Sequence, residues 1–154
     1  MSTFSKFFLI LIKHLPRGVI PGAFTIVYKR NKQGYEYLVI KAKPSGNITF
    51  PGGSLNWKEN FEDAARRELY EETGLKVKHL VELPVIHKFS YKNLPFKPRS
   101  EQHVFAYLIT NNYRANLRSK ETEWFKWVGA NDVERMLTHK ELTKTFKRSV
   151  RYIR

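Results

Sequence analysis

The sequence predicts one mixed α/β domain, because segments with the composition of β-strands alternate with segments that have the apolar spacing of helices. Hydrophobic residues make up 42% and aromatic residues 14% of the 154 residues. This content is enough for a packed core, and it excludes a wholly disordered chain. The length fits a single domain, and no internal repeat or low-complexity segment interrupts it.

Residues 1–18 form the first predicted unit, an amphipathic helix. From Phe4 to Leu15, apolar side chains recur at helical spacing, and Pro16 and Gly18 end the pattern. We expect this helix to pack on the domain or on a second subunit, so a homodimer is an open alternative. An interfacial membrane anchor is the other interpretation.

Residues 19–139 form the predicted central domain, which opens with strands. Residues 23–29 and 35–42 are rich in β-branched and aromatic side chains and predict a hairpin, with residues 31–34 as its four-residue loop. Residues 48–50 predict a short strand that runs into a Pro-Gly-Gly turn.

A helix is predicted at residues 60–73. Asn60 is a good N-cap, acidic residues follow in the first turn, and Gly74 stands where a left-handed residue ends a helix. The second half of the domain has three more predicted strands, at residues 77–87, 103–109 and 124–128. A basic loop, residues 88–99, separates the first two of these strands.

The chain ends in two predicted helices. Asn131 or Asp132 can cap the first, which is short. Residues 140–154 form the third predicted unit, a basic C-terminal helix or tail whose apolar side chains share one face. A solvated surface is the commonest meaning of such a basic run.

Three carboxylates share one face of the helix predicted at residues 60–73. Glu68, Glu71 and Glu72 are spaced i, i+3 and i+4, and they lie on the same side as Ala64 and Ala65. The acids thus continue the apolar stripe, whereas an ordinary acidic surface would lie opposite it. Like charges that are partly desolvated repel each other unless a cation lies among them. Oxygen ligands suit Mg²⁺ or Mn²⁺, so the face predicts a divalent metal site.

Residues 53–75 carry a complete family signature. They read GSLNWKENFEDAARRELYEETGL and match the pattern G-x5-E-x7-R-E-U-x-E-E-x-G-U, in which U is a bulky aliphatic residue, at all nine defined positions. The chain therefore resembles the Nudix hydrolases, and in particular their nucleoside triphosphate pyrophosphohydrolases. The resemblance implies an α/β/α sandwich around a mixed β-sheet. It also implies an enzyme that hydrolyses a nucleoside diphosphate linked to another group.

The resemblance assigns the metal ligands position by position. Glu68, Glu71 and Glu72 would bind Mg²⁺ or Mn²⁺ from the helix, and the Gly52 carbonyl would be a further ligand. Arg67 would orient the carboxylates, so it is grouped with the catalytic residues.

Gly53, Glu59 and Glu123 are assigned supporting roles. Glu59 matches the first glutamate of the signature, which in the family supports the loop and the arginine. Gly52 and Gly53 are expected to let the backbone approach the metal and the phosphates closely.

The general base comes from the helix in some members of the family and from a later loop in others. Residues 121–127 resemble the family's late pattern, in which a tryptophan follows an acid after six residues. This spacing favours Glu121 as the catalytic base over Glu123. The alternative for both is an ordinary glutamate on an exposed loop.

The net charge is +14, from 28 basic and 14 acidic residues, and it predicts anionic partners. The chain has no cysteine, which excludes disulfides, thiolate metal sites and cysteine nucleophiles and fits a cytoplasmic location. The longest purely apolar run, residues 7–12, is far short of the ~20 residues that span a bilayer, so no transmembrane segment is predicted.

The predicted function is metal-dependent cleavage of a phosphoanhydride bond in a nucleotide-like substrate. Pro51-Gly52-Gly53 resembles members that convert a nucleoside triphosphate to a monophosphate and pyrophosphate. Dinucleotide polyphosphates, ADP-ribose or another nucleotide sugar, and the 5′ end of an RNA are the alternative substrates. A basic nucleic-acid-binding module that kept the fold is the alternative outside enzymes, and the complete set of acids argues against it.

Overall fold

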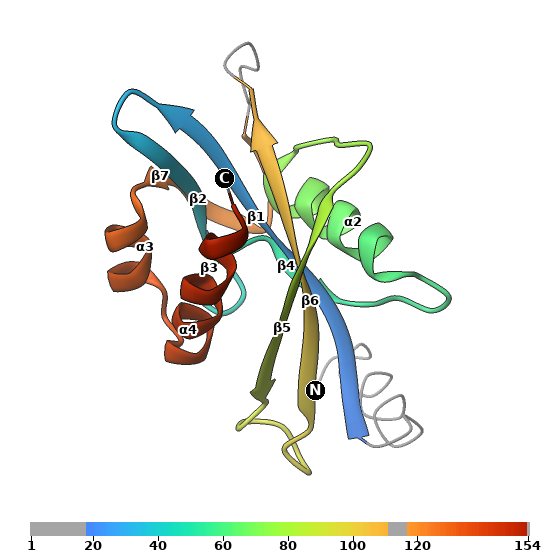
Figure 1. Cartoon of the computed structure of the whole chain (residues 1–154). Helices are drawn as coiled ribbons and strands as arrows, with labels where there is room; N and C mark the ends of the chain where they lie inside the picture. Colours follow the sequence, from blue (N-terminus) through green and yellow to red (C-terminus); the bar gives the residue numbers. More distant parts are fainter. Residues whose placement is uncertain (1–17, 111–116, 154) are drawn as a thin grey trace.

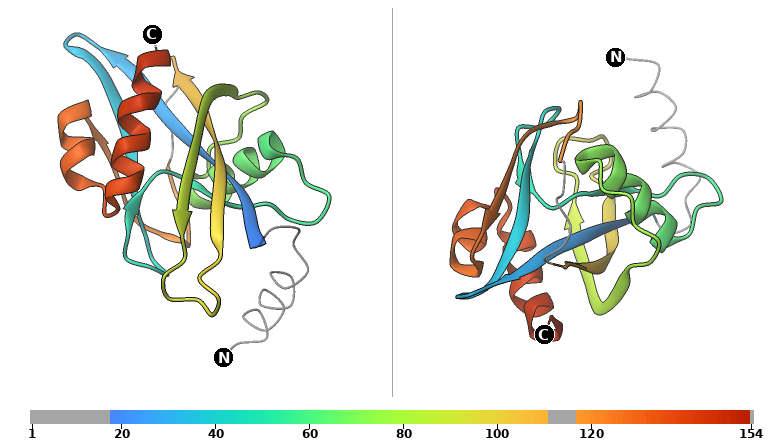
Figure 2. Two further views of the ribbon diagram at one scale, coloured as in Figure 1. Left: turned by 60° about the horizontal axis from the view of Figure 1, so that its bottom comes forward. Right: turned by 90° about the horizontal axis from the view of Figure 1, so that it is seen from above.

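The computed structural model describes residues 18–110 and 117–153. A mixed β-sheet lies between helix α2 (Phe61–Thr73) on one face and helices α3 (Ala130–Met136) and α4 (Lys140–Ser149) on the other (Figures 1 and 2). This arrangement confirms the predicted α/β/α sandwich. The helix predicted in residues 1–18 lies outside the described residues, except for its last position.

Strand β1 (Val19–Asn31) is at the centre of the sheet. It pairs in parallel with β6 (Arg99–Ile109), which pairs antiparallel with the edge strand β5 (Val81–Ser90). At its N-terminal end β1 also pairs with the short strand β4 (Gly52–Ser54). The signature that begins at Gly53 is therefore anchored on the central strand.

The other half of the sheet is built on β2 (Gly34–Ala42). This strand pairs antiparallel with the C-terminal end of β1, with β3 (Ile48–Thr49) and with β7 (Thr122–Val128). Since β7 returns from the C-terminal part of the chain, this pairing carries residues 117–122 to the end of α2.

Apolar side chains fill the space on both faces of the sheet. Leu69 of α2 is fully buried against β1 and β2, and Phe146 of α4 is fully buried against the opposite face. The Phe146 ring lies 5.0 Å from Tyr37 and 5.6 Å from Phe50 between ring centroids.

A short 3-10 turn (Val150–Tyr152) follows α4. No helix in the described part of the chain is long and apolar enough to cross a membrane.

The hairpin was predicted correctly, but its loop was not. Asn31 pairs with Gly34, so only Lys32 and Gln33 lie between the strands instead of the four residues 31–34. The Asn31 side chain accepts a hydrogen bond from the Gln33 N–H at 2.8 Å, which closes the turn. Polar residues that looked like a loop are therefore partly the ends of the strands.

The boundaries of β5 and β6 also differ from the prediction. β5 begins at Val81 rather than at residue 77, since the Leu80 N–H donates to the Glu62 carboxylate at 3.0 Å. Ser90 pairs with Arg99, so the loop is residues 91–98. The exposed basic residues Lys88 and Arg99 made these strand ends resemble a loop in the sequence.

The caps of α2 are as predicted, whereas the cap of α3 is not. The Asn60 side chain accepts from the Asp63 N–H at 2.8 Å, and Gly74 ends α2 with a left-handed φ of 76°. The N-cap of α3 is Gly129, which makes no side-chain cap, and Asn131 and Asp132 both lie inside the helix.

Candidate active site

At the last two turns of α2, the acidic face is partly buried at Glu68 and Glu72 and exposed at Glu71. The Glu68 side chain is only 14% exposed, whereas that of Glu71 is 43% exposed. Ala64 and Ala65 are fully buried one and two turns earlier on the helix. The carboxylates thus follow the apolar stripe, as the spacing predicted.

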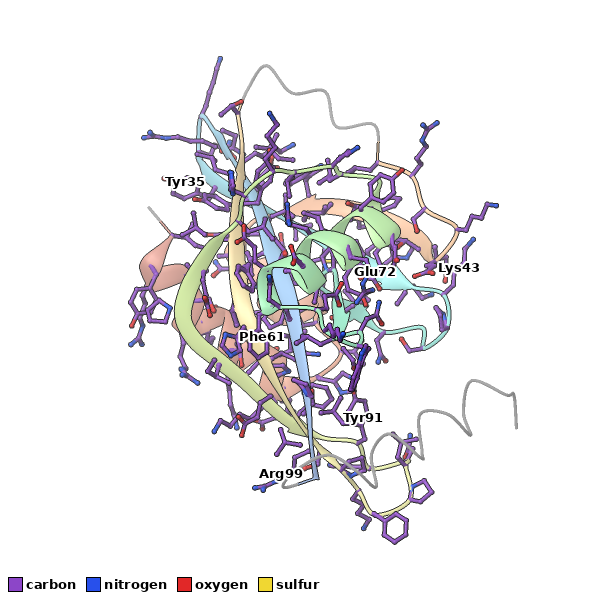
Figure 3. The ribbon with its side chains drawn as sticks, turned by 90° about the vertical axis from the view of Figure 1, so that its right-hand side faces the viewer. Tyr35, Lys43, Phe61, Glu72, Tyr91 and Arg99 are labelled. Atoms are coloured by element: carbon purple, nitrogen blue, oxygen red, sulfur yellow. The ribbon has the colours of Figure 1, made fainter. Side chains whose placement is uncertain are left out.

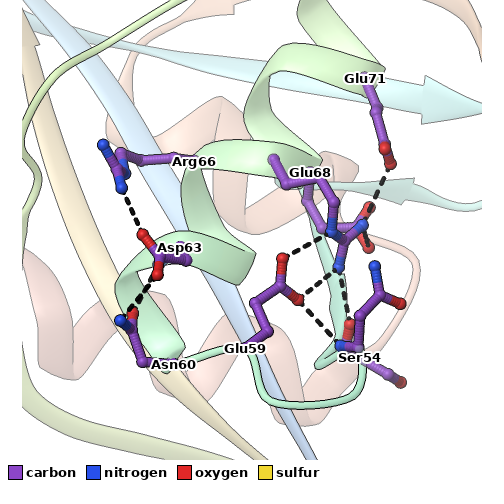
Figure 4. Close-up of polar contacts among 9 residues, drawn as sticks. Ser54, Glu59, Asn60, Asp63, Arg66, Glu68 and Glu71 are labelled. Atoms are coloured by element: carbon purple, nitrogen blue, oxygen red, sulfur yellow. Dashed lines mark hydrogen bonds and ion pairs between the residues drawn. The ribbon is translucent and has the colours of Figure 1, made fainter.

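Arg67 connects two acids of α2, Glu68 and Glu71, with Glu59 in the loop before the helix through a network of hydrogen bonds (Figure 4). Its Nε and Nη2 donate to the two Glu59 carboxylate oxygens at 2.9 and 3.1 Å. Its Nη1 donates to Glu68 at 2.7 Å and to Glu71 at 3.1 Å. The Ser54 carbonyl accepts a further bond from Nη2 at 3.0 Å. These contacts use every donor of the guanidinium group and hold it in one orientation.

The network shifts the pKa values of its members. The hydrogen bond from Arg67 lowers the pKa of Glu59. The hydrogen bonds to Glu59 and Glu68 in turn raise the pKa of Arg67, which stays charged. The pKa of Glu68 is raised, because burial outweighs the contact with Arg67. One cation therefore does not neutralise this group of acids.

Glu72 lies beside the strand that starts the signature (Figure 3). Its Oε2 accepts a hydrogen bond from the Gly52 N–H at 2.8 Å. Burial raises the pKa of Glu72 to about 8, and the nearby charges of Glu68, Glu121 and Glu71 add to the shift. A partly buried carboxylate with such neighbours is ionised at neutral pH only when a cation comes close.

The two glycines make room for the strand and the acids. A Cβ on Gly53 would lie 2.4 Å from a Glu68 carboxylate oxygen. A Cβ on Gly52 would lie 2.2 Å from the Cβ of Phe24 on β1. Glycine was predicted at Gly52 because the backbone there would approach the metal and the phosphates. The close approach that the structure shows is between this backbone and the central strand β1.

The two loop glutamates lie in different surroundings. Glu123 pairs with Lys41 at 3.2 Å, at a β-bulge where β7 leaves its regular register with β2. Glu121 lies near enough to Glu68 and Glu72 to raise the pKa of both. Glu121 itself is exposed, and its assignment as the general base stays a prediction.

The donor set fits a divalent cation. Glu68, Glu71, Glu72 and the Gly52 carbonyl offer only oxygen atoms, which suit Mg²⁺ or Mn²⁺. Within residues 18–110 and 117–153, no three acidic or histidine side chains form a ready-made metal cage. Arg67 donates hydrogen bonds to Glu68 and Glu71, and the Gly52 N–H donates one to Glu72. Mg²⁺ is usually held by one or two carboxylates with water and substrate phosphates, so a full cage is not required.

Sequence reasoning missed three residues that support this site. The Ser54 carbonyl holds Arg67, but any residue has a carbonyl, so no signal could have identified it. The hydroxyls of Ser119 and Thr122 contact the end of α2 across 48 and 50 residues of sequence. Their only signal was their place on either side of Glu121.

Comparison with known proteins identifies the family. A family model described as the NUDIX domain matches residues 20–149. A protein of Bacillus subtilis (strain 168), provisionally named an 8-oxo-dGTP diphosphatase, is 33% identical over 107 residues, or 70% of this chain and 64% of that protein. The 8-oxo-dGTP diphosphatase of Buchnera aphidicola subsp. Schizaphis graminum (strain Sg) is 29% identical over 113 residues, or 71% of this chain and 76% of that protein. The match thus spans less than two thirds of the Bacillus protein.

Solved structures share the fold. The Ap4A hydrolase of C. elegans superposes with a TM-score of 0.72 at 18% identity, over 88% of this chain and 99% of that chain. Identity at this level bears on the fold and not on the substrate.

Proposed function

The chain belongs to the Nudix hydrolase family, and from this premise we propose that it hydrolyses a nucleoside triphosphate to a monophosphate and pyrophosphate. The observation that carries the proposal is the gathering of Glu68, Glu71, Glu72 and Glu121 in a chain of net charge +14. Two relatives with 33% and 29% identity, both named for diphosphatase activity on a nucleoside triphosphate, support this choice of substrate.

Glu68, Glu71 and Glu72, with the Gly52 carbonyl, are the residues that would hold the metal ion. A divalent ion such as Mg²⁺ or Mn²⁺ supplies positive charge for the phosphates and lowers the pKa of a bound water. Members of the family generally need such an ion, and the choice between the two is part of the proposal.

The chain's own residues supply position and a proton acceptor. Arg67 keeps Glu68 and Glu71 in one orientation through its bonds to Glu59 and Ser54. A carboxylate oxygen of Glu121 takes the proton from the water that attacks phosphorus. As the new P–O bond forms, the anhydride P–O bond breaks and pyrophosphate leaves. Little covalent participation by the protein is needed, so positioning and charge do most of the catalysis.

A panel of substrates tests this proposal. The protein is incubated with dGTP, 8-oxo-dGTP, Ap4A, ADP-ribose and a 5′-triphosphorylated RNA, with Mg²⁺, Mn²⁺ or a chelator, and the products are separated by chromatography. We expect metal-dependent release of pyrophosphate and a nucleoside monophosphate from a triphosphate. The Glu71→Gln variant should lose this activity, whereas Glu134→Gln, on α3 beside Lys147, should keep it.

Dinucleotide polyphosphates are the second candidate, because the spacing from Glu121 to Trp127 resembles that of their hydrolases. A clear preference for Ap4A in the panel would replace the triphosphate proposal by this one. If no nucleotide is hydrolysed and RNA is bound, the protein is a nucleic-acid-binding module and the enzymatic proposal is wrong.

A further inference from the structure

The end of α2 has backbone carbonyls that no residue of the helix can satisfy. An α-helix leaves its last four C=O groups without partners, here those of residues 70–73. The Gly74 N–H donates to the Tyr70 carbonyl at 2.8 Å, and the Arg118 N–H donates to the Thr73 carbonyl at 3.1 Å. The carbonyls of Glu71 and Glu72, which lie between these two in sequence, still need donors.

Two hydroxyls from the segment before β7 satisfy these carbonyls. The Ser119 hydroxyl donates to the Glu71 carbonyl at 2.6 Å, and the Thr122 hydroxyl donates to the Glu72 carbonyl at 2.7 Å. Thr122 is buried, with 4% of its surface exposed. The two hydroxyls thus hold the backbone of Glu71 and Glu72, two of the three residues whose side chains are proposed metal ligands.

The same contacts also position Glu121. Its N–H donates to the Ser119 hydroxyl at 3.0 Å, and its carbonyl accepts from the Lys43 N–H at 2.9 Å. One hydroxyl therefore bonds at once to the backbone of Glu71 and to that of Glu121. This contact joins the backbone of α2 directly to that of the loop that carries Glu121.

We propose that Ser119 and Thr122 are positioning residues for the hydrolysis. They hold Glu121 in place relative to Glu71 and Glu72 without touching the substrate. The inference rests on the proposed function, in which Glu121 accepts the proton. A misplacement of about 1 Å in such an arrangement can cost 100-fold in rate, so loss of either hydroxyl should be visible in turnover.

Removal of each hydroxyl tests the inference. Ser119→Ala and Thr122→Val should lower kcat at least about tenfold and leave the KM for the nucleotide nearly unchanged. Ser119→Thr and Thr122→Ser keep the hydroxyl and should restore most of the rate. The matched control is Ser100→Ala, which removes a buried hydroxyl bond to the Ile20 carbonyl at 3.1 Å and should leave kcat unchanged.

A double-mutant cycle separates positioning from a general loss of packing. If Ser119 acts through Glu121, Ser119→Ala should cost no further rate in a Glu121→Gln background. If the two losses multiply instead, the hydroxyl does not act through Glu121, and the inference is wrong. Should Thr122→Val fail to fold, as judged by circular dichroism, the Ser119 variants decide alone.

Binding of Mn²⁺ alone gives a readout that needs no activity. Titration followed by electron paramagnetic resonance should show several-fold weaker binding for Thr122→Val than for Ser100→Ala. If the wild-type protein hydrolyses no nucleotide, the proposed function fails, and this titration still tests the placement of Glu72. If the wild type is active and both variants keep its kcat and Mn²⁺ affinity, the positioning inference alone fails.

Discussion

The Glu72 carboxylate accepts a hydrogen bond from the Gly52 backbone N–H at 2.8 Å, and this contact joins the last turn of α2 to the strand at the start of the signature. It is a single hydrogen bond to a partly buried acid that has Glu68 and Glu121 as neighbours. One neutral donor stabilises the charged form less than this burial and repulsion destabilise it. The result is a position that favours either a proton or a metal ion.

Replacement of Glu72 by Gln should stabilise the metal-free protein at high pH. Because the folded pKa is about 8 and the ordinary value is 4.5, the stability that comes from the proton is full below pH 4.5 and is lost as the pH rises through 8. Glu72→Gln should therefore raise the free energy of unfolding by at most about 5 kcal/mol at pH 9 and by little at pH 4.5. Urea unfolding with a chelator present measures both values. The variant should also lose most turnover, and wild-type turnover would contradict the metal assignment.

Arg67→Lys should lower kcat even though it keeps the charge. Lysine has three donors on one atom and cannot reach Glu59, Glu68 and Ser54 together. We expect a loss of about 100-fold from the displaced carboxylates. Arg66→Lys is the matched control on the same helix, since Arg66 contacts Asp63 and the Lys78 carbonyl outside this network. Equal effects of the two substitutions would contradict a special role for Arg67.

Gly53→Ala should impair metal binding more than it impairs folding. The added Cβ would lie 2.4 Å from a Glu68 carboxylate oxygen, so the Glu68 side chain must move. Gly129→Ala is the control, because its Cβ would meet nothing within 4 Å. Mn²⁺ titration of both variants measures the effect, and unchanged affinity in Gly53→Ala would exclude Glu68 as a ligand in its present orientation.

Acid should destabilise the fold through His87. This side chain is buried against α4, and its ring nitrogen lies 2.8 Å from the Thr145 hydroxyl. Burial lowers the pKa of His87 to about 4, below the ordinary 6.5, so the unfolded chain takes up the proton first. Stability from this residue is full above pH 6.5 and is lost as the pH falls toward 4, by at most about 3 kcal/mol. Unfolding of His87→Gln should show a flatter decline over this range, with the exposed His79→Gln as the control.

The basic outer surface of α4 should steer the substrate rather than bind RNA. Lys140 and Arg148 are exposed, whereas Lys144 pairs with Glu141 at 3.0 Å. Lys140→Glu with Arg148→Glu should lower kcat/KM several-fold at low salt and have little effect at high salt, because salt screens such charges. Binding of a labelled 20-nucleotide RNA near physiological salt, with a log–log salt slope of roughly −0.7 per phosphate contact and lost in the variant, would contradict steering.

Local features of α2 could be predicted because neighbours along a helix are neighbours in space. The Asn60 cap, the Gly74 end and the shared face of Glu68, Glu71 and Glu72 all follow from a period of 3.6 residues. The predicted N-cap of α3 was wrong, because an extended glycine, Gly129, can begin a helix without any side-chain bond.

By itself, the sequence therefore determined the family, helix α2 and the acids that this helix presents. The tertiary structure alone decided which distant backbone and hydroxyl groups hold those acids in place. β7 returns beside β2 and brings Glu121, Ser119 and Thr122 to the end of α2, and β1 lies close enough to β4 to require a glycine at Gly52. These contacts depend on the pairing of strands far apart in the chain. No spacing along the sequence encodes that pairing, because it is set by the packing of the whole sheet.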